Sequence, residues 1–226
     1  MNNLIPTVVV WQGSVWFCSK HKPIKYLGDP LNVVKILSDF GVDEIAIMNL
    51  DEGISDVIYE MPKYVTRPLS ITGGISSFDN AKKLIGSGFD RLGFTDPHIV
   101  ESPVFEKVFG YFGTSTLVIN VRTSPKVMRD VASQIIRQYP ASEYVFHDVE
   151  QAGTLKGLRP NFQTLALECT GVNIAVSGGY NGGAAPKMTR VYYSSKSVFP
   201  LREKPFDFEN DGIPSDFILI PSGVVI

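Results

Sequence analysis

Short apolar segments alternate along this chain with segments whose apolar residues recur at helical spacing. The helical pattern covers residues Leu31–Phe40, Ile54–Tyr64, Ser77–Ser87, Pro103–Phe112, Pro125–Gln138 and Phe162–Cys169. The apolar segments predict β-strands at Leu4–Val10, Glu44–Leu50, Leu69–Thr72, Arg91–Phe94, Leu117–Val121, Tyr144–Asp148, Ile174–Val176 and Arg190–Ser194. Strands and helices in this alternation predict an α/β fold, a closed parallel (βα)8 TIM barrel. Right-handed crossovers then place the carboxyl end of every strand, and the expected site, on one face.

The end of the chain departs from this pattern. After Ser195, prolines and charges interrupt the sequence, and no eighth amphipathic helix is visible. We therefore expect one domain over residues 1–226, with the barrel over about residues 4–197 and an irregular C-terminal extension over 198–226.

Two segments share a strand that ends in a hydroxyl residue and two glycines. Thr72–Gly74 closes one of them, and Ser177–Gly179 closes the other, about half a domain further along. Paired glycines let the backbone turn tightly and approach an anion closely. The repeat predicts a two-fold barrel with a phosphate site in each half, although two ordinary strand-to-helix turns would give the same pattern.

The composition limits the classes of partner. The 226 residues are 44% hydrophobic, and 21 basic and 23 acidic residues give a net charge of −2. This balance predicts neither nucleic acid nor a membrane surface as a partner. Cys18 and Cys169 predict reduced thiols in a cytoplasmic protein, and no apolar run approaches the ~20 residues that span a bilayer. The spacing of His21, His98 and His147 fits no metal site, and we expect no cofactor.

The region after the first strand is expected to be a long loop. Lys20, Lys22 and Lys25 lie in it, where they could close over a phosphorylated ligand or simply be solvated. Trp11 and Trp16 flank its first turn. They could stack on a sugar or a base, but packing over the barrel mouth is the stronger expectation.

An ordered set of short motifs resembles a known family. The set comprises Leu4–Pro6, Gly28–Pro30, Gly41–Glu44, Gly73–Ile75, Gly88–Arg91, Gly153–Gly157 and Ser177–Gly179. It resembles the histidine-biosynthesis barrels, which are the phosphoribosylformimino isomerase and the cyclase subunit of imidazole glycerol phosphate synthase. Within that family, Lys22–Pro30 is most similar to cyclase-like proteins of surface-polysaccharide clusters, which are associated with amidation of N-acetyl sugars.

The catalytic positions depart from the family. Its chemistry uses one carboxylate at the end of the first strand and one at the end of the fifth, and the matching residues here are Val9 and Asn120. An amide cannot act as a general base at neutral pH. Neither isomerase nor cyclase activity is therefore expected. Asp148, Glu150 and His147 are weak candidates for relocated catalytic groups.

The resemblance implies phosphate sites that are only partly retained. Gly74 and Thr95 match the first site. The residues that match the second are Gly153, Gly179, Ser194 and Ser195. Backbone N–H groups and hydroxyls of this kind suit a phosphate dianion.

The opposite end of the barrel carries a second implication. In the cyclase, ammonia from a glutaminase enters there past a ring of four charged residues. The matching positions are Asn3, Glu44, Arg91 and Glu143, and Asp90 matches an acidic position at the partner contact. Such charges can equally form stabilising ion pairs at a barrel base.

These observations lead to one functional expectation and two alternatives. The leading one is an accessory, synthase-like or ammonia-delivering subunit that acts with a glutaminase in amidation of a phosphorylated or nucleotide-linked sugar. One alternative is a catalytically inactive binding or scaffold barrel, and the other is a phosphosugar enzyme with relocated catalytic residues.

Overall fold

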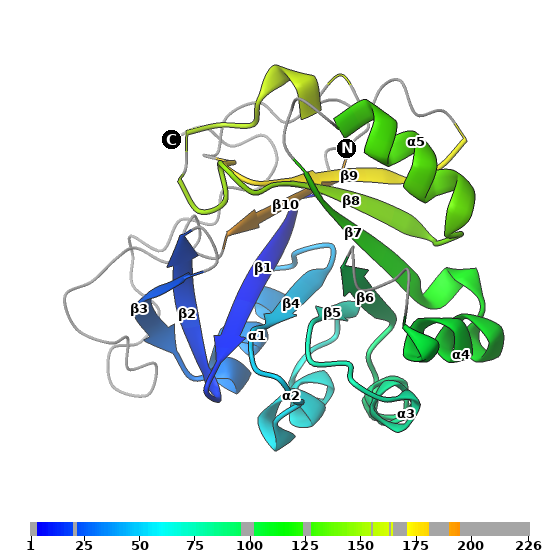
Figure 1. The fold of residues 1–226 in the computed structure, drawn as a ribbon. Coiled ribbons are helices and arrows are strands. Elements are labelled where there is room, and N and C mark those ends of the chain that lie inside the picture. Colours follow the sequence, from blue (N-terminus) through cyan, green and yellow to red (C-terminus); the bar gives the residue numbers. More distant parts are fainter. Residues whose placement is uncertain are drawn as a thin grey trace.

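Eight parallel strands close into a barrel in the computed structural model (Figure 1). The structure describes residues 4–19, 22–95, 102–123, 128–154, 156–162, 164, 171–180 and 190–194. The barrel strands are β1 (Leu4–Trp11), β4 (Ile45–Asn49), β5 (Leu69–Thr72), β6 (Arg91–Thr95), β7 (Leu117–Thr123), β8 (Glu143–Asp148), β9 (Ile174–Ser177) and β10 (Arg190–Ser194). Each pairs in parallel with the next, and β10 pairs with β1 to close the sheet. The predicted (βα)8 barrel is confirmed.

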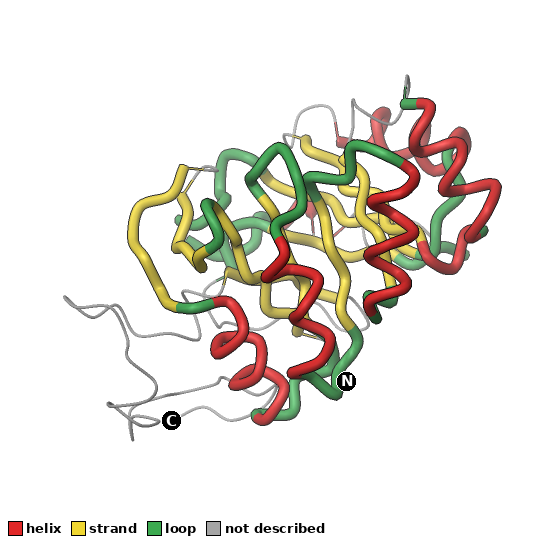
Figure 2. The backbone as a smooth tube through the Cα atoms, turned by 90° about the horizontal axis from the view of Figure 1, so that it is seen from below, coloured by secondary structure: helices red, strands yellow, loops and turns green. Residues whose placement is uncertain are grey.

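The described helices lie on the outer side of the barrel, along part of its circumference, as Figures 1 and 2 show. They are α1 (Pro30–Asp39), α2 (Asp56–Glu60), α3 (Phe78–Ser87), α4 (Pro103–Phe112) and α5 (Met128–Gln138), with short 3₁₀ turns η1 (Met61–Tyr64) and η2 (Thr114–Thr116). α1 begins where the sequence indicates, because the Asp29 carboxylate caps the N–H of Asn32 and Pro30 occupies the first turn. The helix expected over 54–64 divides into α2 and η1 near Pro62.

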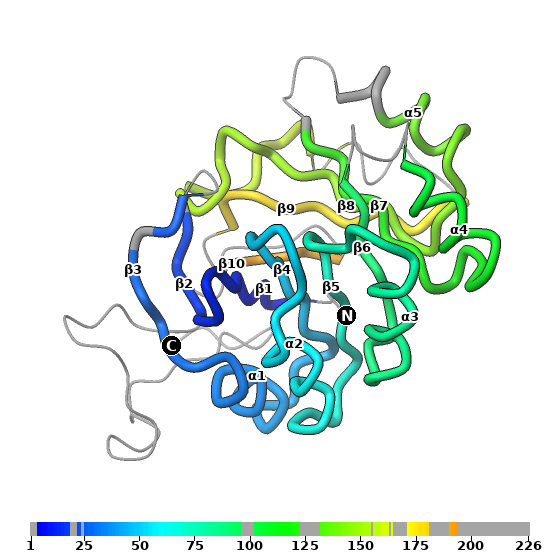
Figure 3. The backbone as a smooth tube through the Cα atoms, turned by 60° about the horizontal axis from the view of Figure 1, so that its bottom comes forward, coloured from blue at the N-terminus to red at the C-terminus, as the bar shows by residue number. Residues whose placement is uncertain are grey.

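The expected long loop after the first strand is wrong, because an antiparallel hairpin stands there instead. β2 (Ser14–Ser19) pairs with the end of β1, and β3 (Lys22–Gly28) pairs with β2 at the edge of the sheet. Gln12 and Gly13 form the two-residue turn between β1 and β2, with φ values of 49° and 71°. Positive φ at both positions matches the twist of a tight hairpin. Figures 1 and 3 show the hairpin standing beside β1, outside the closed barrel.

Apolar residues pack in two separate layers. The larger lies between the barrel and the surrounding helices, where buried side chains of alternate strand positions such as Val8, Ile47 and Leu92 meet the helices. The smaller lies inside the barrel and consists of Ile5, Ala46, Val118, Val145, Ala175 and Tyr192. Apart from Tyr192 these inner residues are aliphatic and mostly small, and they leave room in the barrel interior.

Part of the expected architecture lies outside the described residues. This holds for Ser195, for the C-terminal extension over 198–226 and for most of the helix expected over 162–169. The single-domain division stays a prediction. Among the described helices, none is long and apolar enough to cross a membrane.

Candidate functional site

A pocket of about 400 Å³ occupies the barrel interior and opens at the carboxyl ends of the strands. We call it the lumen pocket. Its wall includes hydroxyl, amide and imidazole groups, contributed by Thr7, Asn49, Ser70, Thr72, Thr95, Asn120, His147, Ser177 and Tyr192. A pocket with several convergent polar groups at this end of a barrel is the expected position of a binding site.

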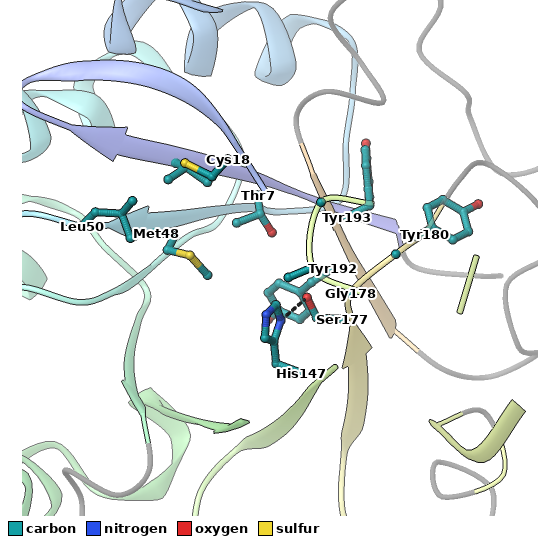
Figure 4. A pocket seen from close by; sticks show the side chains of 14 residues that line it. Thr7, Cys18, Met48, Leu50, His147, Ser177, Gly178, Tyr180, Tyr192 and Tyr193 are labelled. Carbon is teal, nitrogen blue, oxygen red and sulfur yellow. Dashed lines mark hydrogen bonds between the residues drawn. The ribbon is translucent and has the colours of Figure 1, made fainter. Parts of the chain in front are cut away.

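A smaller pocket of about 60 Å³ adjoins the first and lies at the barrel mouth (Figure 4). We call it the mouth pocket. It shares Thr7, His147 and Ser177 with the lumen pocket and adds Cys18 from the hairpin. Burial raises the pKa of the Cys18 thiol to about 11, so this thiol stays protonated at neutral pH.

The two positions that the resemblance matches to the family's acids lie in these walls. Val9 lines the mouth pocket, and Asn120 lines the lumen pocket, where its amide donates a 3.1 Å hydrogen bond to the Thr72 hydroxyl. Ala152, which directly precedes Gly153 in the loop after β8, also lines the mouth pocket. Among the described residues that line either pocket, none carries a carboxylate. The described residues of these walls therefore offer no carboxylate for proton transfer.

His147 is the candidate catalytic residue that faces the pockets. It lies on β8, is 9% exposed, and its Nδ1 is 3.0 Å from the Ser177 hydroxyl at the end of β9 (Figure 4). Alternation along a strand places His147 on the inner side and its neighbour Asp148 on the outer side. An imidazole hydrogen-bonded to a hydroxyl can hold or move a proton at the pocket wall.

Asp148 and Glu150 lie away from both pockets. The Asp148 carboxylate accepts the N–H groups of Glu150 and Gln151, at 3.1 and 3.2 Å, and pairs with Arg159 at 3.2 Å. Burial raises the pKa of Asp148 even though Arg159 opposes the shift. Glu150 is exposed and pairs with the same Arg159 at 2.7 Å. In this arrangement the two carboxylates stabilise the turn after β8.

The two Gly-Gly turns are both fixed by backbone packing. Gly73 and Gly178 have φ values of 92° and 104°. A Cβ at Gly73 would overlap the carbonyl oxygen of Asn49, and a Cβ at Gly178 would lie 2.6 Å from that of Asp148. Each first glycine thus packs on the end of the preceding strand, so the repeat has a structural cause whether or not a phosphate binds.

The expected phosphate residues divide between the two pockets. Thr95 and Gly73 line the lumen pocket. Gly74 follows Gly73 in the chain and has a φ of 75°. Gly153 and Gly179 line the mouth pocket. Ser194 ends β10, and Ser195 lies outside the described residues. Phosphate binding at either place stays a prediction.

Four charged side chains form a closed ring at the amino ends of the strands, which we call the charged ring. Arg91 pairs with Glu44 and, at 2.9 Å, with Glu143. Arg190 pairs with Glu44 and, at 2.8 Å, with Glu143. Asn3 lies outside the described residues, and Arg190 was not found by sequence reasoning. Its signal was present, because Arg190 begins the eighth barrel strand and the layers of such barrels come from alternate strands.

Burial and the surrounding charges act against each other in this ring. Burial raises the pKa of Glu44, but the charges of Arg91 and Arg190 lower it by more, so the net shift is downward. Burial lowers the pKa of Arg91, and Tyr192, Glu143 and Glu44 more than reverse this effect. Both residues therefore stay ionised at neutral pH, as members of a buried, compensated network.

Tyr192 joins the charged ring to the lumen pocket. Its hydroxyl donates to Glu143 at 2.6 Å and accepts from Arg91 at 3.2 Å, while the residue lines both pockets. Ser70 also lines the lumen pocket, and its hydroxyl hydrogen-bonds to Glu44. The floor of the pocket is therefore in direct contact with the ring.

Asp90 has a local role in the barrel. Its carboxylate accepts the N–H of Leu69 at 2.9 Å, and its own N–H donates to the Leu69 carbonyl at 2.9 Å. Both bonds hold the start of β5. Its expected contact with a partner stays a prediction, and a charge reversal at Asp90 would also disturb the strand.

Fold and site together define a (βα)8 barrel with a polar interior and a charged ring at its base. The family model described as histidine biosynthesis protein matches residues 3–184, and the chain belongs to this family. It is 25% identical over 130 residues to the imidazole glycerol phosphate synthase subunit HisF of Nostoc sp., a match that covers 55% of this chain and 50% of that protein.

A second relative is matched over nearly its whole length. The synthase subunit HisF of Bacillus pumilus is 20% identical over 235 residues, which covers 93% of this chain and 92% of that protein. The matches to the first relatives span only about half of their length.

Proposed function

We propose that this chain is an accessory, synthase-like subunit that passes ammonia from a docked glutaminase through the barrel to a phosphorylated or nucleotide-linked sugar. The observation that carries the proposal is the contact between the lumen pocket and the charged ring, made by Ser70 and Tyr192. The pocket extends from the mouth to this contact, so the ring is the layer that separates it from the base of the barrel.

The chemistry of the ring suits control of a small neutral molecule. Its two glutamates and two arginines compensate each other, and hydrogen bonds to Tyr192 hold it closed. Opening requires one ion pair to separate, which docking of a partner at the base could drive. The walls above the ring would then let ammonia pass without holding ammonium, because among the described residues they offer no carboxylate and include the cation Arg122.

The residues that line the two pockets also help to decide between the candidate activities. Val9 and Asn120 replace the carboxylates that cyclisation would need, which supports an accessory role in place of cyclase activity. The His147–Ser177 pair favours the second candidate, a phosphosugar enzyme with relocated catalytic groups. A binding or scaffold barrel is the remaining alternative and predicts no glutaminase.

The proposal is tested by co-purification from the native host with a charge-reversal pair. Asp43 is exposed at the base, directly before Glu44, and Glu52 is exposed in the loop after β4 at the opposite end. Asp43→Lys should reduce the glutaminase activity that co-purifies with the chain, and the matched Glu52→Lys should leave it unchanged. Because a specific interface buries about 1,000 Å² or more, one reversed charge weakens it without affecting distant surfaces.

Two outcomes contradict the proposal. One is the absence of glutaminase activity in the wild-type eluate. The other is equal recovery with Asp43→Lys and wild type, which would exclude docking at the base.

A further inference from the structure

Three aromatic residues of the hairpin region form a cluster, which we call the aromatic cluster: Trp11, Trp16 and Tyr26. The rings of Trp11 and Trp16 meet edge to face with centroids 5.3 Å apart, and those of Trp16 and Tyr26 meet likewise at 5.9 Å. Trp16 and Tyr26 are direct cross-strand partners in β2 and β3. All three residues are only partly buried, so aromatic surface reaches solvent.

The cluster lies on the side of the barrel mouth. On β2, Val15 and Phe17 are buried in the outer core, which places Trp16 and Cys18 on the other face. Cys18 lines the mouth pocket. On β1, Trp11 follows Val9 by two residues and therefore continues the side of the strand that lines the same pocket.

Hydrogen bonds hold the cluster in place. The Trp16 indole N–H donates to the Trp11 carbonyl at 3.0 Å. The Asp51 carboxylate accepts the N–H of Gln12 at 3.0 Å and so ties the hairpin turn to the loop after β4. With its indole N–H already bonded, Trp16 offers an apolar ring face that is fixed before any ligand arrives, and a surface of this kind costs little entropy to use.

The combination points to an amphipathic ligand. A sugar ring has one face of C–H groups, which stacks on aromatic rings, and a rim of hydroxyls, which exchanges hydrogen bonds with polar side chains. The mouth pocket, which is lined by Cys18 of the same strand as Trp16, presents Thr7, His147 and Ser177. We propose that the aromatic cluster is a carbohydrate-stacking surface, on which a sugar ring lies while its substituents enter the polar pockets.

This inference deepens the proposed function, because it names how the acceptor sugar is held. It can be tested without a glutaminase. Failure of sugar binding would leave docking at the base untouched, and failure of docking would leave sugar binding untouched.

The chain itself supplies the probe, since its two tryptophans are both in the cluster. Intrinsic tryptophan fluorescence of the full chain is titrated with N-acetylglucosamine, N-acetylglucosamine 1-phosphate, UDP-N-acetylglucosamine, ribose 5-phosphate, UMP and inorganic phosphate. A saturable change is expected with at least one sugar-bearing probe, and no such change with inorganic phosphate. UDP-N-acetylglucosamine should act more strongly than UMP.

A variant pair assigns the effect to the cluster. Tyr26→Leu should weaken binding of the active probe about tenfold, since the stacked ring is lost. Tyr111→Leu, which alters a 65% exposed aromatic residue of α4 outside the cluster, should bind as wild type does. Circular dichroism tests whether each variant is folded. Tyr26→Phe, which keeps the aromatic ring, should bind as wild type does even if Tyr26→Leu is misfolded.

Three results would overturn the inference. No probe gives a saturable change; UMP matches UDP-N-acetylglucosamine, which would assign the surface to a base; or a folded Tyr26→Leu binds as tightly as wild type.

Discussion

Arg91 and Arg190 each contact both Glu44 and Glu143 at the base of the barrel. The Glu44 and Glu143 side chains are 7% and 1% exposed, so each depends on its arginine partners for the charge it carries. Replacing one arginine would leave two buried carboxylates with a single cation. At the scale of the residue, therefore, the four side chains of the charged ring are coupled, and loss of one weakens the contribution of the others to stability.

Arg91→Met is expected to lower the free energy of unfolding by about 3 kcal/mol, because it leaves the buried carboxylates undercompensated. The measurement is urea unfolding at neutral pH. Arg67→Met, at an exposed position of the same face, is the control and should change little. A loss at Arg91 no larger than that at Arg67 would show that the ring does not stabilise the barrel.

The ring also predicts a pH dependence with a definite sign. The pKa of Glu44 is lowered from its ordinary value of 4.5, so its contribution is present above that value and is lost as pH falls through the lower, folded value. Asp148 acts in the opposite direction, because its raised pKa lets the folded state take up a proton first. Unfolding free energy measured between neutral pH and pH 3 should therefore fall less steeply for Glu44→Gln than for wild type, and more steeply for Asp148→Asn. Equal slopes in all three proteins would contradict both assignments.

At the scale of the element, the barrel strands could be predicted and the hairpin could not. Buried parallel strands are continuous apolar runs, as in Ile45–Asn49, and helix α1 carries its start signal in Asp29 and Pro30. β3 lies at the sheet edge, where Lys22, Pro23 and Lys25 are tolerated, so its pattern is that of a loop. The one sequence signal of the hairpin is the glycine of the Gln12–Gly13 turn.

The backbone conformation of the hairpin turn predicts which substitutions stabilise the protein. Gln12 adopts a φ of 49°, which asparagine tolerates better than glutamine, and Asn-Gly is the preferred pair for this turn. Gln12→Asn should raise the free energy of unfolding by about 0.5–1 kcal/mol, and Gln12→Val should lower it by about 1–2 kcal/mol, because a β-branched residue is strained at positive φ. The backbone N–H that Asp51 accepts is kept in both variants. Chemical unfolding decides, and equal stability of the two variants would show that the turn is not strained.

Candidate site residues could be predicted only as far as alternation and order along the chain allow. The inward position of His147 follows from its place on β8, and Asn120 could be matched to the family acid position. Arg190 could not be paired with Glu44 from sequence, since 146 residues separate them and the pairing depends on closure of the barrel. The aromatic cluster required the cross-strand register of Trp16 and Tyr26, which no periodicity in this segment indicates.

At the scale of the whole molecule, the charged ring and the two pockets follow one another along the barrel. The charged ring lies at the amino ends of the strands, the lumen pocket extends from it, and the mouth pocket with the aromatic cluster lies at the carboxyl ends. Under the two proposals above, the barrel separates a surface for a partner from a surface for a sugar, and its interior is the route between them. The chain belongs to the histidine biosynthesis family, and the described residues of its pocket walls carry no carboxylate.

The most direct measurement of this route compares two nitrogen sources in a variant with a filled barrel. Ala46 lines the lumen pocket two residues above Glu44, so Ala46→Phe should obstruct the route while leaving both ends intact. The co-purified complex receives ATP to activate the acceptor, together with host sugar phosphates and sugar nucleotides and either amide-¹⁵N-glutamine or ¹⁵N-ammonium chloride. Mass spectrometry follows the label into the sugars. We predict that Ala46→Phe lowers incorporation from glutamine about tenfold and leaves incorporation from ammonium, which can enter at the mouth, nearly unchanged. Unchanged incorporation from glutamine, or an equal loss from both sources, would contradict a route through the barrel.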